Sequence, residues 1–288
     1  MKLKTNTAKN VQLNPPTPKE HGAWGMLLVP FVMGVGVVGH FTIETLWLLA
    51  AVLLAFLSQK PFAQLLTTQE RISTSRKLKR SLAWFGIYAG SSAAIFLILY
   101  VPYQMKGLRL FGFLGSPVIL AYSYFVWRKA VRSVLGELAG IAGLTMTGPM
   151  ACYAAAGEIR AVGFWLWAFC ILYFVSSIFY VKAVVQKFLR LKSGQPSSLH
   201  GMEWACLLYH LGMIGVLLAL FILRILPLTG LLAFLPVAVR GLQVSFKTSG
   251  RLNFAIIGWS EVGYSIFFAI FLVAGLRSSE AVLTTLFR

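Results

Sequence analysis

The sequence predicts an all-α membrane protein with about nine transmembrane helices in a single bundle. Of the 288 residues, 58% are hydrophobic and only 12% are charged, and the mean hydropathy is +0.77. This composition is too apolar for a water-soluble domain with a polar surface. The apolar residues also gather in runs of roughly 20, the length that an α-helix needs to cross a bilayer. The lipid bilayer is therefore the first partner that the sequence predicts.

Each predicted span is an apolar run bounded by polar or charged residues. The nine runs are 22–41, 44–64, 82–102, 108–127, 133–156, 161–182, 203–223, 225–240 and 253–276. No cleavage site of small residues follows the first run, so we interpret it as a helix and not as a signal peptide. We expect a polar segment over residues 1–21, one transmembrane domain over residues 22–276 and a short tail over residues 277–288.

The positive charge of the chain predicts its orientation in the membrane. The net charge is +18, but the cations lie in short loops between apolar runs, so we expect no nucleic-acid partner. Twenty of the 26 Lys and Arg residues fall on one side of the predicted topology. By the positive-inside rule that side is cytoplasmic. The N-terminus and the loops that contain Ser73 and Ser197 are then cytoplasmic, the C-terminus is extracytoplasmic, and the location is a bacterial plasma membrane.

Small residues predict close helix packing. Gly86 and Gly90 are one helical turn apart, as are Gly136 and Gly140, and such pairs allow membrane helices to approach closely. Gly148-Pro149 predicts a kink in the fifth span. The chain has three cysteines, all in apolar runs and without paired spacing, which is typical of small core residues.

All eight acidic residues are glutamates, and two of them fall deep within predicted spans. These two are Glu137 and Glu261. A carboxylate near the middle of a bilayer costs roughly 2.5–3.5 kcal/mol on insertion scales, so we expect both to face the protein interior. In one alternative, a glutamate pairs with Arg128 or Arg132 only to hold helices together.

Other polar residues are predicted at the same level, in the cytoplasmic half of the membrane. Gln64, Gln186, His210 and Arg240 are among them, together with the ligand-binding set that we predict: Glu20, His21, Trp24, Gln59, Lys60, Arg128, Glu137, Tyr180, Lys182 and Glu261. The alternative for the cations is that they reach to lipid headgroups. For Trp24 and Trp259 it is a place in the interfacial aromatic belt. The histidines lack ligand spacing, so we expect no metal site.

One charged stretch opens the first span and carries a family resemblance. Lys19-Glu20-His21-Gly22-Ala23-Trp24 is followed by Met26-Leu27-Leu28-Val29-Pro30-Phe31. These residues resemble the YwiC-like family of bacterial membrane proteins. The resemblance implies an integral membrane protein and names no reaction.

Spans two to seven are also similar to UbiA-type intramembrane prenyltransferases. That family has nine helices, long cytoplasmic loops after the second and sixth helices, and a cavity that opens inward. The stretch from Tyr122 to Arg128 and the span that ends at Gly148-Pro149 resemble the middle of that fold, and Tyr180 matches a tyrosine of its second motif. The resemblance implies a UbiA-like bundle and an isoprenoid, quinone or other anionic lipid as ligand.

The sequence departs from the UbiA pattern where the reaction is carried out. In that family two aspartate-rich motifs hold Mg²⁺ against a diphosphate. Here the first motif region, Ser58 to Gln64, and the second, Ser177 to Val184, contain no carboxylate, and the chain has no Asp. Lys60 and Lys182 stand there instead and would favour an anion without a metal. We therefore expect no cofactor.

Three hypotheses for function follow from these residues. The first is a UbiA-like scaffold with a cytoplasm-facing polar cavity for a lipid or anionic ligand, which includes a divergent or inactive prenyltransferase. The second is a proton-coupled transporter of small solutes, because intramembrane carboxylates can carry protons. The third is a non-catalytic membrane partner of a respiratory or cofactor-assembly complex.

Overall fold

The fold is all-α throughout the described part of the chain. The computed structural model describes residues 21–67, 75–193, 200–246 and 254–285, and every regular element in them is a helix. The predicted fold class is therefore confirmed.

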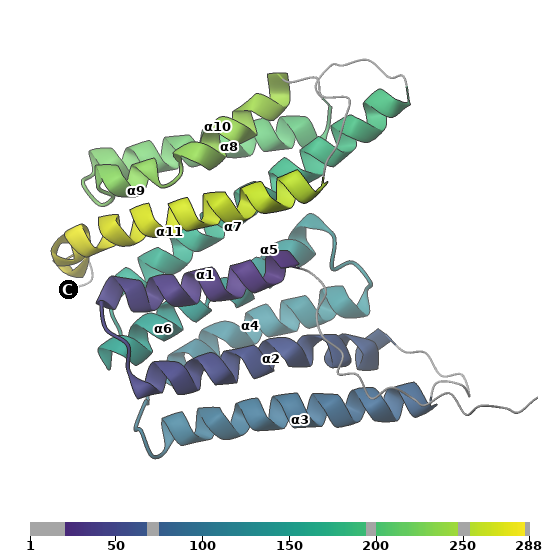
Figure 1. Ribbon diagram of the computed structural model, residues 1–288, viewed down its shortest axis with the longest axis vertical. Helices are drawn as coiled ribbons and strands as arrows, with labels where there is room; N and C mark the ends of the chain where they lie inside the picture. Colours follow the sequence, from purple (N-terminus) through teal and green to yellow (C-terminus); the bar gives the residue numbers. More distant parts are fainter. Residues whose placement is uncertain (1–20, 68–74, 194–199, 247–253, 286–288) are drawn as a thin grey trace, which may run out of the picture.

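Successive spans run in opposite directions (Figure 1), with α5 and α6 forming one span and α9 and α10 another. Their bounds are α1 His21–Val38, α2 Ile43–Thr67, α3 Ser75–Tyr100, α4 Leu108–Trp127, α5 Val134–Thr145, α6 Thr147–Ala156, α7 Ala161–Lys192, α8 Met202–Ile222, α9 Leu228–Leu232, α10 Leu235–Phe246 and α11 Phe254–Thr285.

Seven segments of the described chain are long and apolar enough to cross a membrane, with α5 and α6 counted as one. Two shorter apolar stretches, Gly22–Val38 and Leu228–Val244, correspond to the first and eighth predicted spans. The nine apolar runs thus each correspond to a helix or a pair of helices, which makes this a multi-pass membrane protein.

Two predicted spans are broken at prolines. The fifth span divides at Met146, between α5 and α6, slightly ahead of the kink expected at Gly148-Pro149. The eighth span divides into α9 and α10, just before Pro236. A proline has no N–H to donate to the carbonyl four residues earlier, so the helical hydrogen-bond pattern fails one turn before it.

Two helices run beyond the ends that hydropathy predicted. The sixth span was expected to end at residue 182, but α7 continues to Lys192. The ninth was expected to end at residue 276, but α11 continues to Thr285, through most of the predicted tail. Hydropathy marks where apolar residues stop, whereas charged and polar residues with good helix propensity continue the helix into water.

The loops that the sequence predicts to be basic join helices at one end of the bundle, which we call the basic end. Helices α2, α4, α7 and α10 finish there and α3, α5, α8 and α11 begin there, at the right in Figure 1. The predicted cytoplasmic loops all connect helices there. Helix α11 finishes at the opposite end of the bundle.

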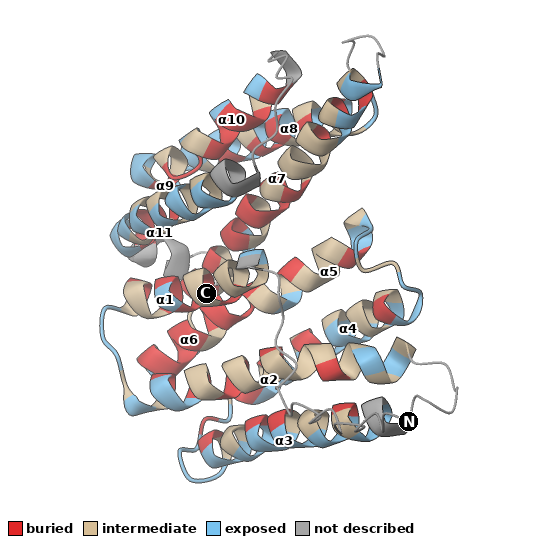
Figure 2. Cartoon of the chain, turned by 45° about the vertical axis from the view of Figure 1, so that its right-hand side comes forward, coloured by how far each residue is buried: buried red, intermediate tan, exposed pale blue. Residues whose placement is uncertain are grey.

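The core lies around α6 and α7, where buried residues gather in Figure 2. One apolar cluster takes its buried residues from α1 to α4 and α6, and a second from α1, α5 to α8, α10 and α11. Helices α1 and α6 belong to both clusters and therefore join the two halves of the bundle.

Helix α1 approaches its neighbours at glycines. A Cβ added to Gly34 would lie 2.1 Å from the Gly148 carbonyl oxygen on α6. At the far end of α1, Gly39 has φ +93° and packs against Arg277 of α11, whose Nε donates to the Val37 carbonyl at 3.3 Å. The first and last helices of the chain are thereby in direct contact.

The glycine pairs predicted from spacing behave differently. A Cβ on Gly86 or Gly90 would meet nothing within 4 Å, so the expectation that they serve helix packing is wrong for α3. Gly140 does face Tyr122 of α4, at 3.8 Å, while Gly136 lies against the backbone of the α4–α5 turn. The spacing pattern indicates a small face but not whether another helix covers it.

Candidate functional site

The buried charged side chains of the described chain gather at the basic end. Lys187, Arg190, Glu203 and Arg240 are buried there, as is His210. The other buried polar side chains in the described ranges are serines and threonines. Buried charges require partners, because their desolvation is costly. Three groups of contacts at this end supply those partners.

The first group joins α5 to α7 through Glu137 and Lys182. Ser133 caps α5 by accepting a hydrogen bond from the Gly136 N–H at 3.1 Å, which places Glu137 in the first turn. The Lys182 ammonium lies 3.0 Å from Glu137 Oε2 and donates to the Arg132 carbonyl at 2.7 Å. Both side chains of this ion pair remain partly exposed, Lys182 by 25% and Glu137 by 31%.

The partner of Glu137 differs from the alternative that the sequence suggested. A pairing with Arg128 or Arg132 was one option, but the described contacts give the carboxylate to Lys182 of another helix. Arg132 takes part through its backbone carbonyl. The first group therefore links helices that are distant in sequence.

The second group joins α7, α10 and α11 around Arg240. Its Nη1 pairs with Glu261 Oε1, and its Nη2 donates to Ser177 Oγ at 3.1 Å. Ser177 in turn donates to Glu261 Oε2 at 2.8 Å. The guanidinium carbon lies 4.2 Å from the centre of the Tyr180 ring and 5.0 Å from that of Tyr264, close enough for cation–π attraction.

Polar contacts continue one step deeper, to Ser265 and Tyr173. Ser265 donates to the Glu261 carbonyl at 2.8 Å and lies 3.4 Å from the Tyr173 hydroxyl. The Tyr173 ring stacks on Phe268 with centroids 4.0 Å apart, and Phe234 meets both rings. Aromatic side chains thus lie next to the innermost of these polar contacts. We call Tyr173, Phe234 and Phe268 the aromatic layer.

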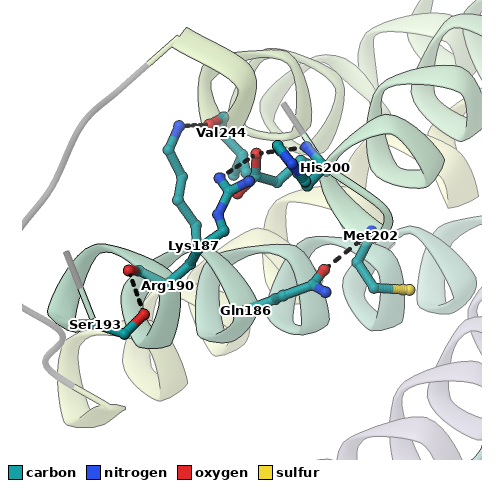
Figure 3. A network of polar contacts seen from close by, with 8 residues as sticks. Gln186, Lys187, Arg190, Ser193, His200, Met202 and Val244 are labelled. Carbon is teal, nitrogen blue, oxygen red and sulfur yellow. Dashed lines mark hydrogen bonds and ion pairs between the residues drawn. The ribbon is translucent and has the colours of Figure 1, made fainter. Parts of the chain in front are cut away.

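The third group clamps the end of α7 to α8 and α10 (Figure 3). Arg190 donates twice to the Glu203 carboxylate, at 2.8 and 3.0 Å, and the His200 N–H also donates to it at 3.3 Å. Lys187 donates to the Val244 carbonyl at 2.7 Å. Gln186 accepts from the Met202 N–H at 3.0 Å. This group holds the basic ends of three helices together.

The sequence analysis missed the most buried of these charges. Only Glu137 and Glu261 were expected to lie deep, yet the Glu203 side chain is just 1% exposed. The sequence did offer one signal for its pairing with a cation: Glu203 lies in the first turn of α8, and the preceding helix α7 ends in basic residues. Arg240 was placed at the right level but was left out of the predicted ligand-binding set, because the sequence does not show that it meets Glu261.

The remaining predicted site residues take no part in these three groups of contacts or lie outside the residues that the structure describes. Glu20 lies outside the described residues, as does the side chain of His21. Trp24 packs edge-on against Phe56, with ring centroids 4.8 Å apart. Gln59 and Lys60 are half-buried on α2, and Arg128 is exposed at the end of α4. Trp259, at 78% exposure, faces outward.

The predicted set therefore separates into parts. Lys182 meets Glu137 on one face of α7, and Tyr180 approaches Glu261 through Arg240 on another. In the residues that the structure describes, no three His, Cys, Asp or Glu side chains come close enough to hold a metal ion. The three cysteines are buried thiols and form no disulfide.

Comparison with known proteins agrees with the motif at the start of α1. The family model described as YwiC-like protein matches residues 17–153. Over these residues the chain is YwiC-like. The YwiC-like stretch includes α1 to α5, most of α6 and thus Glu137, whereas Lys182, Arg240 and Glu261 follow it.

Two relatives extend the likeness. The uncharacterized protein YwiC of Bacillus subtilis is 27% identical over 174 residues, covering 59% of this chain and 67% of the relative. An uncharacterized protein of Haemophilus influenzae is 26% identical over 259 residues, 89% of this chain and 97% of the relative. No solved structure matches this chain. The UbiA-like arrangement therefore stays a prediction from sequence.

Proposed function

We propose that this YwiC-like protein binds an anionic amphiphile at its basic end, which faces the cytoplasm of a bacterial plasma membrane. One observation carries the proposal: Lys182, a partly exposed cation, is held beside Glu137 and the Arg132 carbonyl at that end, where the buried charges of the described chain also lie. Cations gathered at one end of the bundle suit a headgroup that enters from that side while its apolar chain stays in lipid.

The headgroup site in this proposal lies between α4, α5 and α7. Lys182 is partly exposed there, and the exposed Arg128 ends α4 four residues before Arg132, whose carbonyl Lys182 contacts. An ammonium has three N–H donors. Lys182 donates one to the Arg132 carbonyl and lies 3.0 Å from Glu137 Oε2 as its ion-pair partner. Lys60 on α2 is the further cation that we assign to the site. Cations of this kind bind phosphate or carboxylate oxygens directly, without a bridging metal.

Charge reversal tests the headgroup site. Lys182→Glu should weaken binding of an isoprenoid phosphate by roughly tenfold or more, because it replaces a charge-assisted contact with repulsion. Binding to purified wild-type protein, measured by native mass spectrometry, should be equal in EDTA and in millimolar Mg²⁺. Lys106→Glu, an exposed change at the opposite end, serves as the matched control and should leave binding unchanged.

Three results would contradict this site. The first is Mg²⁺-dependent prenyl transfer that survives the Lys182 and Lys60 substitutions, which would favour a divergent prenyltransferase. The second is solute flux in proteoliposomes, which would favour a transporter. The third is a preparation that carries stoichiometric protein subunits and no lipid, which would favour the membrane-partner hypothesis. Lipid identification after mild purification decides among them most directly.

Cysteine labelling tests the orientation. Cysteines placed at Ser73 and Ser197, which lie outside the described residues, should react with a membrane-impermeant maleimide only in inside-out vesicles. A cysteine at Gln104, exposed in the α3–α4 turn, should show the opposite pattern. The native cysteines are buried and should give little background. Labelling of Ser73 and Ser197 from the outside would invert the topology.

A further inference from the structure

Arg240 has the features of a binding group as well as those of a structural one. Its side chain is only 6% exposed, and its Nε, although buried, has no hydrogen-bond partner. The rings of Tyr180 and Tyr264 lie next to the guanidinium and limit its movement. A cation held in this way keeps Nη1 directed at Glu261, which supplies the negative charge, and Nη2 directed at Ser177.

Glu261 is the more accessible member of the pair. Its side chain is 24% exposed, four times the value for Arg240. Ser177 supports the same carboxylate through its hydroxyl at 2.8 Å, and also accepts from Arg240 at 3.1 Å. If the Glu261 side chain turned away, Arg240 and Ser177 would remain in place with donors directed at the space left by a carboxylate.

We propose that Arg240 and Ser177 form a binding site for a ligand carboxylate, which enters by displacing Glu261. We infer a carboxylate ligand because the group that now occupies the site is the carboxylate of Glu261. The donors already hold a planar group with a single negative charge, and one guanidinium balances one such charge in a poorly solvated place. A phosphate with two charges would leave one uncompensated there.

The carboxylate site is distinct from the Lys182 headgroup site. It lies among α7, α10 and α11, on another face of α7, and shares no side chain with the contact between Lys182 and Glu137. The inference therefore goes beyond the proposed function. Either site can fail its test while the other passes.

Glu261→Gln tests the inference with a gain of binding. The amide keeps the shape of Glu261 but removes its charge, so Arg240 is left buried without a counterion and should recruit one from solution. Radiolabelled acetate and oleate should each be measured by equilibrium binding to the full-length protein in nanodiscs of zwitterionic lipid, with empty nanodiscs subtracted. We expect Glu261→Gln to bind carboxylate at least about tenfold more tightly than wild type.

Matched variants separate this site from general effects on the protein. Adding Arg240→Gln to Glu261→Gln leaves two neutral amides and should abolish the gain. Ser177→Ala alone keeps the ion pair and should weaken carboxylate binding several-fold, which provides a test that does not require the Glu261 variant to fold. A gain for oleate alone identifies an amphiphile as the ligand, and a gain for both probes identifies a small free acid.

Three results would contradict a carboxylate site at Arg240 and Ser177. If Glu261→Gln binds neither carboxylate more tightly than wild type, Arg240 and Glu261 form a purely structural pair. An affinity gain for inorganic phosphate without one for acetate or oleate would refute the ligand class. Unchanged carboxylate affinity in Ser177→Ala would remove Ser177 from the site and overturn the arrangement as proposed.

Discussion

Gly34→Ala should lower the free energy of unfolding by about 1–3 kcal/mol, the usual cost of overpacking a tightly packed interior. The new Cβ would lie 2.1 Å from the Gly148 carbonyl oxygen and 3.0 Å from the Cys152 backbone nitrogen. Backbone atoms cannot turn aside as a flexible side chain can, so α1 and α6 would have to separate. Thermal unfolding of the purified protein in detergent measures the loss.

Gly25→Ala provides the control on the same helix. A Cβ there meets nothing within 4 Å, and alanine favours helix over glycine by about 1 kcal/mol. We expect this variant to unfold at the wild-type temperature or slightly above it. Equal stability of the Gly34 and Gly25 variants would show that α1 and α6 pack less closely than described.

Glu203→Gln should destabilise the fold by roughly 3–5 kcal/mol, since it leaves the Arg190 charge buried without its counterion. The pair is nearly inaccessible, with side-chain exposures of 7% for Arg190 and 1% for Glu203. The same carboxylate also accepts from the His200 N–H, so the connection into α8 should loosen as well. Denaturant unfolding in mixed micelles, followed by circular dichroism, gives the difference in free energy.

The effect of Glu203→Gln can be compared with those of two other variants. Glu158→Gln breaks the ion pair with Arg160 at the opposite end, where the side chains are 67% and 30% exposed, and should cost only ~0–1 kcal/mol. Replacing the buried pair together, as Arg190→Met with Glu203→Leu, should restore most of the loss because no lone charge remains. A double variant as unstable as Glu203→Gln would contradict this account.

Apolar length predicted the helices because it is a local property of the sequence. Each run of about 20 apolar residues becomes helical wherever its neighbours lie, since an unpaired backbone group in lipid is costly. Helix ends were predicted less well: Lys192 and Thr285 end their helices in polar sequence, where hydropathy gives no signal. The breaks at Met146 and before Pro236 depended on proline, which is again local.

The partners within the candidate site could not be predicted in the same way. Glu137 and Glu261 were recognised because a carboxylate inside an apolar run is unusual. Their partners, Lys182 and Arg240, come from other helices and depend on how those helices are arranged. Gly34 went unnoticed for the same reason, because its contact with Gly148 is a crossing of two helices and has no counterpart in sequence spacing.

The contact between the first and last helices has a consequence for biosynthesis. Helix α1 leaves the ribosome long before Arg277, which follows Val37 by 240 residues yet contacts Val37 and Gly39 in the folded protein. Until α11 has been inserted, this face of α1 must remain against lipid or a membrane chaperone. A chain that stops before α11 would therefore leave the end of α1 uncovered, and such incomplete products should be cleared by membrane proteases much faster than the full-length chain.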